Sequence, residues 1–494
     1  MNAAEVVLAG GAPGATALVA GDDTMTYAAL RAASGRWGRL LAGRGLRPGD
    51  RVLLVMADRP DLIAAYLGAI RIGAVPAAVN SRWSADELAF AVSDSQARLL
   101  VADPAFEADA GEAAKAAGAG LVIADAEVCA GQPDMLDAVE RDPEAAAFLI
   151  YSSGTTGRPK ASIHRHRNVA IADRALREVF GLGARDRLYA TSKMFFAYAL
   201  GHCLFGALKL GASVVLHEDW PCPAAVAETL ARQRPSVLLS VPTFYRDLLD
   251  GGVMTAEILS GLRLLLSAGE RLPETLFERW HAETGQAIVE GMGASETLFL
   301  FLANRPDAPR AGCTGLPTPG SQLKLVGDNG AAADGAGRTG ELWVKLESNA
   351  SGYWRRPDKT LAAFDQGWFR SGDLMHRDAD GYWHYQGRAD DMLKLAGQWI
   401  NPVEVESLAI SELSGGEVAA VALADADGLP RLVLFVAGIA APARAALQQR
   451  LEHAFARALP RFKRPREVRF VDRLPRTATG KVQRYRLREI ATTT

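Results

Sequence analysis

A glycine- and hydroxyl-rich loop between Phe148 and Lys160 has the side chains needed to bind a polyphosphate. The segment reads Phe-Leu-Ile-Tyr-Ser-Ser-Gly-Thr-Thr-Gly-Arg-Pro-Lys, an apolar run followed by two glycines, four Ser or Thr and a lysine. Glycines let the backbone approach an oxyanion closely, while hydroxyls and an ammonium add hydrogen bonds and positive charge. The segment is not a Walker A loop, because the second glycine comes too early and Pro159 precedes the lysine. By itself, a loop of this composition is equally typical of an ordinary protein surface.

Three further segments combine glycine with a charged side chain. They are Gly291-Met-Gly-Ala-Ser-Glu296, Ser371-Gly-Asp373 and Gly480-Lys481. A carboxylate such as Asp373 can accept hydrogen bonds from two hydroxyls at once. A cation such as Lys481 can stabilise negative charge on a bound group. Each segment alone is weak evidence, because a Glu in a glycine-rich turn or a Lys in a basic tail is usually just solvated.

Strand and helix patterns alternate through much of the chain. An apolar run over 50–56 predicts a buried strand, 60–72 an amphipathic helix, and 74–80 a second strand. Similar apolar runs recur over 99–102, 121–124, 212–216 and 236–241. Such alternation is typical of the α/β class, with layered and largely parallel sheets.

The pattern of apolar runs and turn residues changes from about Gly315. Short strand-like runs over 322–326 and 341–345 are separated by many Gly and Pro residues, which predicts an antiparallel or barrel-like subdomain. After Gly387-Arg-Ala-Asp-Asp the α/β pattern returns. We therefore predict a large N-terminal domain over 1–389, which includes the barrel-like subdomain, and a small mobile C-terminal α+β domain over 390–494.

The composition is that of a globular enzyme with more than one domain. A chain of 494 residues is too long to fold around one ordinary hydrophobic core. Hydrophobic residues make up 49% of the chain and charged residues 23%. A net charge of -2 argues against a general polyanion binder, and no apolar run approaches the length of a membrane span. Four cysteines without a C-x-x-C pair fit a reducing cytoplasm. We expect a cytoplasmic monomer or homodimer with no nucleic-acid or membrane partner.

The C-terminal segment is locally basic. Between 450 and 488 there are thirteen Lys or Arg against three Asp or Glu. This segment is either a solvated basic face, which composition alone favours, or a docking surface for a phosphorylated ligand.

The string from Tyr151 to Lys160 resembles the signature loop of the adenylate-forming superfamily, which includes acyl-CoA synthetases, luciferases and peptide-synthetase adenylation domains. The resemblance covers nearly the whole chain, because the other segments follow in the family's order. One departure is Ala161, where the family usually has glycine. The resemblance implies an AMP-forming acid–thiol ligase that uses ATP, Mg²⁺ and coenzyme A. A substrate carboxylate would attack the α-phosphorus of ATP, pyrophosphate would leave, and a thiol would then displace AMP from the acyl-adenylate.

The resemblance also assigns roles to individual residues. Lys481 and Glu296 would be catalytic, Glu296 and Thr155 would hold Mg²⁺, and Asp390 would be the hinge of the small domain. The residues that would bind ATP or AMP are Ser152, Ser153, Gly154, Thr155, Thr156, Gly157, Lys160, Gly269, Glu270, Glu290, Gly291, Met292, Ser295, Asp373 and Arg388. Met292 stands where the family usually has Tyr, so adenine would lie against a thioether.

Several segments are similar to those of benzoate-CoA ligases, which points to a small aromatic acid as substrate. They cover 195–202, 267–270, 290–293 and 391–400. In those relatives the positions that match Ala197, Tyr198, Gly293, Phe299 and Leu300 line the acyl pocket. Phe299 stands where benzoate-activating relatives tend to carry His, so benzoate, a hydroxy- or aminobenzoate and a five-membered heteroaromatic acid all stay open. Tyr198 could offer its hydroxyl to a polar ring substituent.

Three other interpretations of the sequence differ in the acyl acceptor or in the class of protein. The acyl acceptor could be the phosphopantetheine of a separate carrier protein instead of coenzyme A. The chain could be a non-catalytic nucleotide-binding protein on the same fold, against which the intact Lys481, Glu296 and Asp373 argue. An acyl-enzyme hydrolase is disfavoured, because no G-x-S-x-G motif occurs and Ser321-Gln-Leu-Lys324 fits S-x-x-K by spacing alone.

Overall fold

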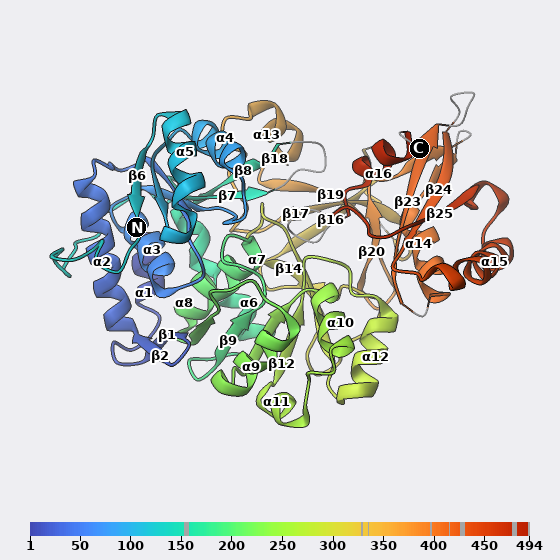
Figure 1. The fold of residues 1–494 in the computed structure, drawn as a ribbon, viewed down its shortest axis with the longest axis horizontal. Helices are drawn as coiled ribbons and strands as arrows, with labels where there is room; N and C mark the ends of the chain where they lie inside the picture. The colour runs from blue at the N-terminus through green and yellow to red at the C-terminus, as the bar shows by residue number, and fades with distance from the viewer. Residues whose placement is uncertain are drawn as a thin grey trace. The chain divides into compact units, whose positions relative to one another are not determined.

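The structure is a computed structural model that describes residues 1–152, 158–327, 330–333, 335–395, 398–413, 415–424, 430–476 and 482–492 (Figure 1). It divides into two compact units. Unit 1 comprises Met1–Ser152, Pro159–Leu323 and Val344–Arg370, and unit 2 comprises Ser153–Arg158, Lys324–Trp343 and Ser371–Thr494. The two-domain division at 389/390 stays a prediction.

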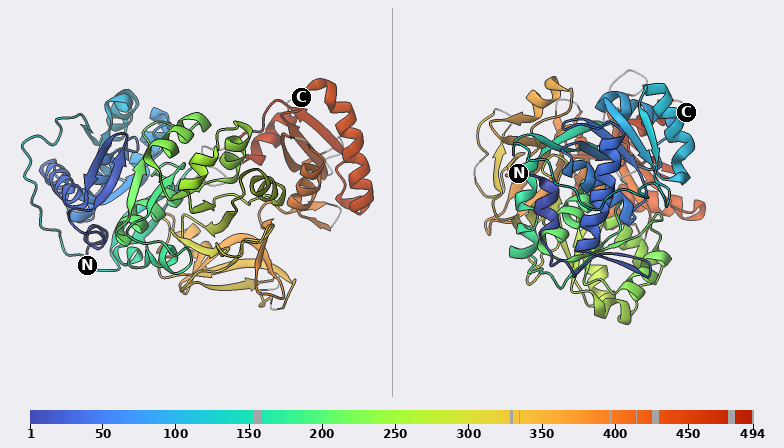
Figure 2. Two further views of the ribbon diagram at one scale, coloured as in Figure 1. Left: turned by 90° about the horizontal axis from the view of Figure 1, so that it is seen from below. Right: turned by 90° about the vertical axis from the view of Figure 1, so that its left-hand side faces the viewer.

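The first sheet of unit 1 is fully parallel. Its strands β3 (Arg51–Val55), β4 (Val75–Ala78), β5 (Ala97–Ala102) and β6 (Gly120–Ile123) lie in the order β4-β3-β5-β6. The associated helices are α1 (Ala3–Leu8), α2 (Tyr27–Gly43), α3 (Pro60–Arg71), α4 (Ala85–Ser95), η1 (Pro104–Phe106) and α5 (Glu107–Ala117). Helices α2 and α3 pack side by side, as the right-hand view of Figure 2 shows in blue. The predicted strand–helix–strand pattern is confirmed here.

The local sequence explains where these helices begin. Pro60 occupies the first turn of α3, where its missing N–H costs nothing. The Ser84 side chain accepts from the backbone of Glu87, whose carboxylate reaches back to Ser84, so a capping box starts α4. All residues of β4 and four of five in β3 are buried, as expected of strands covered on both faces.

The second sheet of unit 1 has nine strands and carries most of the candidate site. Its order is β15-β14-β13-β12-β11-β9-β10-β1-β2. The strands are β1 (Thr16–Ala20), β2 (Asp23–Thr26), β9 (Arg187–Ala190), β10 (Ser213–Leu216), β11 (Val237–Ser240), β12 (Leu264–Ser267), β13 (Ile288–Gly293), β14 (Leu300–Ala303) and β15 (Leu316–Pro317). The middle strands pair in parallel, and β2, β14 and β15 pair antiparallel at the two edges.

Helices α9 (Pro223–Gln233), α10 (Pro242–Asp250), α11 (Ala256–Gly261) and α12 (Glu274–Thr284) connect these strands and cover one face. Their apolar sides form a core around Tyr245 and Trp280, whose rings lie 5.0 Å apart edge to face. The other short helices of this unit are η2 (His166–Ile171), α6 (Arg174–Glu178), α7 (Ala197–Ala199), η3 (Leu200–Ala207) and α8 (Leu208–Leu210), of which η3 is a π-helix.

A separate antiparallel hairpin brackets the predicted phosphate loop. Strands β7 (Ala146–Ser152) and β8 (Lys160–Arg165) pair so that Ser152 lies opposite Lys160. The pairing places Lys160 at the base of the loop, on the strand that leaves it.

The Gly- and Pro-rich region forms the predicted antiparallel sheet. Its strands β16 (Gln322–Val326), β17 (Thr339–Lys345), β18 (Phe364–Asp365), β19 (Trp368–Arg377) and β20 (Trp383–Arg388) have the order β16-β17-β19-β18, with β20 paired to β19. Both β18 and β20 pair antiparallel with β19. Helix α13 (Pro357–Ala363) precedes β18. The left-hand view of Figure 2 shows these strands in yellow and orange.

The C-terminal part of unit 2 is a small α+β assembly. It contains β21 (Leu393–Leu395), β22 (Gln398–Ile400), α14 (Pro402–Ser411), β23 (Glu417–Ala424), β24 (Pro430–Ala437), α15 (Ala441–Ala458), η4 (Arg461–Lys463), β25 (Glu467–Val471) and α16 (Arg484–Thr492). In the sheet β23-β24-β25, the first pair is antiparallel and the second parallel. Apolar residues of α14 and α15 pack on one side of this sheet, and Leu487 of α16 packs with the alternate residues of β23 and β24.

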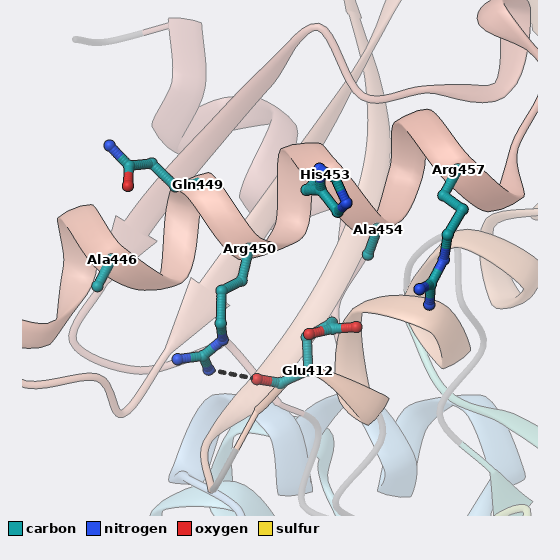
Figure 3. A pocket seen from close by; sticks show the side chains of 7 residues that line it. All are labelled: Glu412, Ala446, Gln449, Arg450, His453, Ala454 and Arg457. Carbon is teal, nitrogen blue, oxygen red and sulfur yellow. Dashed lines mark hydrogen bonds between the residues drawn. The ribbon is translucent and has the colours of Figure 1, made fainter.

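The predicted basic segment includes a surface groove of about 510 Å³ along α15 (Figure 3). Arg450, His453 and Arg457 line it, and Arg450 donates to the carbonyl oxygen of Glu412 at 2.6 Å. These three side chains are exposed. The groove therefore has the character of a solvated basic face, and its docking role stays a prediction.

Candidate active site

A buried carboxylate, an ammonium and a phenol meet where β8, the turn after β13 and the residues before α13 come together. Tyr353 donates its hydroxyl hydrogen to Glu296 Oε1 at 2.6 Å. Lys160 Nζ lies 3.1 Å from the same oxygen and 2.6 Å from the Tyr353 hydroxyl oxygen, to which it donates. Burial alone would raise the pKa of Glu296, but the Lys160 ammonium and the Tyr353 hydroxyl outweigh that effect and lower the pKa. Glu296 is therefore an ionised carboxylate inside the protein.

The turn that carries Glu296 is held by several main-chain hydrogen bonds. The Thr297 hydroxyl oxygen accepts from Ala294 N at 3.0 Å, and Ala350 N donates to the Glu296 carbonyl at 2.7 Å. Ser348 Oγ donates to the Thr297 carbonyl at 2.6 Å. Leu298 has φ +64°, a left-handed conformation that is costly for a leucine. Backbone strain of this kind persists where the surrounding contacts over-determine it, as they do in functional turns.

His164 fixes the neighbouring peptide. Its Nε2 lies 2.8 Å from the carbonyl oxygen of Ser295, which can only accept, so Nε2 is the donor. The ring is fully buried, stacks on Phe148 at 5.1 Å, and has its pKa lowered by burial to about 4. A neutral imidazole thus orients Ser295, the residue assigned to the α-phosphate, without adding charge.

The residues assigned to the adenine pocket lie at the ends of two adjacent strands. Ser267 of β12 is in register with Glu290 of β13, so the segments that follow them run side by side. Glu270 accepts from Thr243 Oγ1 at 2.6 Å. A Cβ on Gly291 would lie 2.6 Å from Leu300 Cδ1, so a larger residue there would require the Leu300 side chain to move. The sequence prediction that groups Gly269, Glu270, Glu290, Gly291 and Met292 is consistent with this placement.

The raised pKa of Glu290 can be tested by the pH dependence of protein stability. Burial raises its pKa to about 8, whereas an unfolded glutamate titrates near ~4.3. Between these pH values the native state keeps a proton that the unfolded state releases, so the free energy of unfolding falls as the pH rises. Gln has the same shape without the charge. We expect the melting temperature of Glu290→Gln, relative to the unchanged protein, to increase from pH 5 to about pH 8 in scanning fluorimetry and to level off above that pH.

The matched control for that experiment is Glu278→Gln, an exposed position on α12 of the same unit. Its melting temperature should follow that of the unchanged protein at every pH. Parallel curves for Glu290→Gln would show that Glu290 does not hold a proton in the native state.

The residues assigned to the acyl pocket are also brought together. Gly293 of β13 is in register with Leu300 of β14, and Ala197 and Tyr198 lie on α7. Phe299 is 4% exposed, which fits either a pocket lining or an ordinary core position, so its place in the acyl pocket stays a prediction. The Tyr198 hydroxyl donates to the carbonyl oxygen of Leu266 at 3.0 Å. The hydroxyl proton thus ties α7 to β12, and a contact of this hydroxyl with a ring substituent stays a prediction.

In unit 2, the two residues assigned to the ribose form an ion pair. Asp373 on β19 is in register with Arg388 on β20, and Arg388 Nη1 lies 3.1 Å from Asp373 Oδ1. The same nitrogen donates to the Ser371 carbonyl at 2.8 Å, and Nε contacts Asp390 Oδ1 at 3.0 Å. Burial would lower the pKa of Arg388, but Asp373 and Asp390 raise it. The predicted hinge residue is thus tied to the predicted ribose site by one guanidinium.

Six of the assigned residues lie outside the described part of the chain: Ser153, Gly154, Thr155, Thr156, Gly157 and Lys481. Their roles stay predictions. In the described residues, no group of three or more His, Cys, Asp or Glu could hold a metal by itself. A lone ionised carboxylate such as Glu296 nevertheless fits Mg²⁺, which is usually held by one or two carboxylates together with substrate phosphates. None of the described helices has the length and hydropathy of a membrane span.

Two functional candidates escaped sequence analysis. Tyr353 lies 57 residues beyond Glu296, and His164 lies just past the loop motif, in β8. Neither belongs to the motifs from which the other site residues were predicted. Only the tertiary structure brings their polar atoms to the Ser295–Glu296 turn.

Comparison with known proteins agrees with this geometry. The AMP-binding enzyme family matches residues 8–354, and the AMP-binding enzyme C-terminal domain matches residues 404–481. The chain is 42% identical to a 3-hydroxybenzoate–CoA ligase of Aromatoleum sp. (strain CIB), over 99% of this chain and 97% of the relative. It superposes on a solved anthranilate CoA ligase, AuaEII in complex with anthranoyl-AMP, with a TM-score of 0.91 and 31% identity, over 100% of this chain and 98% of the other. A benzoate CoA ligase from Burkholderia xenovorans LB400 gives a TM-score of 0.91 and 32% identity, over 99% and 100%.

The chain therefore belongs to the AMP-binding enzyme family, and within it to the adenylate-forming aryl-CoA ligases. It is an AMP-forming acid–thiol ligase, as the sequence resemblance predicted. The readings as a non-catalytic nucleotide-binding protein and as an acyl-enzyme hydrolase are not supported.

Proposed function

We propose that this chain joins a small aromatic carboxylic acid to coenzyme A at the expense of ATP, and that Glu296 holds the Mg²⁺ that accompanies the nucleotide. The observation that carries the assignment of Glu296 is its buried, ionised state between Lys160 and Tyr353. A carboxylate with these partners presents an anionic oxygen in a fixed place, which is what a hard cation prefers. The relatives named above act on 3-hydroxybenzoate, benzoate and anthranilate, all acids of one ring.

In the first half-reaction, the chain's own groups would orient the nucleotide and stabilise charge. Ser295, held through its carbonyl by His164, would meet the α-phosphate, and Lys160 would add positive charge beside it. When bound, Mg²⁺ would neutralise part of the charge on the phosphate oxygens. The turn is pinned before the nucleotide arrives, so little reorganisation is needed during the reaction.

The ribose would be held by the pair in unit 2. Asp373 has carboxylate oxygens that can accept from both ribose hydroxyls, and Arg388 keeps that carboxylate ionised and oriented. Because Arg388 also contacts Asp390, a rotation of the backbone at the proposed hinge would change the position of Arg388 relative to the ribose.

In the second half-reaction, the thiol would attack the acyl-adenylate carbonyl and AMP would leave. Lys481 would act only in the first half and would be withdrawn by rotation about Asp390. Coenzyme A is our proposed acceptor, and a carrier protein is the alternative. We further infer a cytoplasmic monomer or homodimer, a location supported by four free cysteines.

The test is pyrophosphate release with ATP, Mg²⁺ and a panel of aromatic and aliphatic acids, with and without coenzyme A, followed by product mass. Release with one-ring aromatic acids and an aryl-CoA product would support the proposal. Release without any coenzyme A adduct would point to a carrier protein. A clear preference for aliphatic acids would contradict the assigned substrate class.

A further inference from the structure

His202 lies buried beside two side chains assigned to the acyl pocket. Its side chain is 2% exposed. Its ring centroid is 5.3 Å from that of Tyr198 and 6.0 Å from that of Phe299, and both contacts are edge to face. His202 belongs to the π-helix η3, which directly follows the α7 turn that carries Ala197 and Tyr198. This imidazole therefore adjoins the region in which the aromatic ring of the substrate is expected.

The hydrogen bond of His202 determines which ring nitrogen carries the proton. Nδ1 lies 2.9 Å from the carbonyl oxygen of Tyr198. A carbonyl can only accept, so Nδ1 carries the hydrogen. Burial lowers the pKa of His202 to about 4, so the ring is neutral near pH 7. A neutral imidazole has one N–H, and Nε2 is therefore a hydrogen-bond acceptor.

That acceptor is unsatisfied. Among the residues that the structure describes, Nε2 of His202 is buried and has no hydrogen-bond partner. The hydroxyl of neighbouring Tyr198 donates elsewhere, to Leu266. Buried polar atoms in native proteins are paired in the great majority of cases, so an unpaired one at a binding site calls for a donor that arrives with the ligand.

The position of His202 is fixed by close packing. A Cβ on Gly201 would lie 2.7 Å from the carbonyl oxygen of Leu298 and 3.4 Å from Phe299 Cδ1. The π-helix thus packs directly against the strained turn that follows Glu296. π-Helical turns are rare and occur frequently at functional sites. The acceptor is held by two rigid segments, which favours a defined ligand contact over an adaptable one.

We propose that Nε2 of His202 accepts a hydrogen bond from a hydroxyl or amino group on the ring of the bound acid, and that the enzyme thereby selects benzoates with a hydrogen-bond donor. This inference rests on the proposed function. An unsubstituted ring would cover Nε2 with C–H groups and leave it desolvated without a partner. The names of the relatives do not decide the matter, because 3-hydroxybenzoate and anthranilate carry such a donor and benzoate does not.

Two substitutions separate the acceptor from the rest of the side chain. In His202→Asn, the amide can still donate to the Tyr198 carbonyl but nothing replaces Nε2. In His202→Gln, the longer side chain can bring a carbonyl oxygen to the place of Nε2. The substrates are pairs of hydroxy- and methylbenzoates substituted at the same ring position, since the two groups are similar in size but only the hydroxyl donates. Methoxybenzoates, which accept but do not donate, complete the set.

The unchanged enzyme is expected to prefer the hydroxy acid over its methyl partner by about tenfold or more in kcat/KM for pyrophosphate release, at one ring position. Methoxy acids should behave like methyl acids. His202→Asn should bring the ratio close to one, mainly by weakening binding of the hydroxy acid in titration calorimetry. His202→Gln should keep a larger ratio than His202→Asn.

The unchanged enzyme alone can overturn the inference, so a variant that fails to fold leaves it testable. A methyl acid used as well as the hydroxy acid at every ring position would overturn it, and so would an equal ratio in the unchanged enzyme and both folded variants. In either case the proposed function would stand, because aromatic acids are still activated. No pyrophosphate release with any aromatic acid would instead overturn the proposed function and this inference with it.

Discussion

Glu296→Gln is expected to lower kcat/KM for adenylate formation by about 10²–10³-fold. The substitution keeps the size of the side chain but removes the negative oxygen that lies 3.1 Å from Lys160 Nζ and accepts from the Tyr353 hydroxyl. The neutral amide is a poor Mg²⁺ ligand, and the Lys160 ammonium loses its ionic partner. Pyrophosphate release at several Mg²⁺ concentrations measures the effect, and a higher Mg²⁺ requirement should accompany the lower rate.

Two further substitutions show how much of the effect comes from the charge of Glu296 and how much from its hydrogen bond. Tyr353→Phe removes one hydrogen bond to Glu296 but leaves the charge, so it should cause a smaller loss of rate and a smaller shift of the Mg²⁺ requirement in the same direction. Glu347→Gln removes a solvent-exposed carboxylate that pairs with Arg174 at 2.8 Å in the same unit, and should leave activity unchanged. A Glu296→Gln enzyme with an unchanged Mg²⁺ requirement would show that Glu296 does not hold the cation.

The sheets could be predicted because buried parallel strands are apolar along their whole length. The run 236–241 becomes β11 and the run 212–216 becomes β10, with every residue of both strands buried. The change to an antiparallel sheet near Gly315 was also visible, since frequent Gly and Pro residues mark turns between short strands. Local pattern and tertiary structure agree in these regions, which is typical of segments whose task is packing.

The residues of the candidate site could be predicted only where they belong to a short sequence motif. Asp373 and Arg388 are each beside a glycine, and the structure pairs them across β19 and β20. Tyr353 also follows a glycine, but it belongs to none of the motifs named above, and its relation to Glu296 depends on a return of the chain after 57 residues. The hydrogen bond from the Tyr198 hydroxyl to Leu266 could not be predicted for a similar reason. Hydrogen-bond partners of a buried side chain are set by its neighbours in space, and Leu266 is far from Tyr198 in sequence.

The same distinction explains why His202 became informative only in the structure. In the sequence it is the last residue of a segment that resembles benzoate-CoA ligases. The structure adds the bond from Nδ1 to Tyr198 and the isolation of Nε2, which together assign a direction to the missing hydrogen bond. In this proposal the choice of substrate depends on the polarity of one buried nitrogen, whereas the residues proposed for adenylation belong to motifs that the sequence displays.

Lys481→Ala is expected to lower adenylate formation by about 10²–10³-fold and to leave the second half-reaction near its original rate. The reason is that negative charge builds up between carboxylate and α-phosphate only in the first half, and a point cation is most effective there. Lys481 lies outside the described residues, so this prediction rests on its place in the Thr-Ala-Thr-Gly-Lys motif. Pyrophosphate release measures the first half, and thioester formation from chemically prepared aroyl-AMP and coenzyme A measures the second.

Lys463→Ala is the matched control, because this lysine also belongs to the basic C-terminal segment but is already paired with Glu404 at 2.6 Å. It should leave both half-reactions intact. Equal losses in both halves for Lys481→Ala would mean that the lysine supports folding or nucleotide binding in general. A loss confined to the first half would establish that one chain separates its two chemistries by supplying and withdrawing a single charge, which is the physical content of the proposed rotation about Asp390.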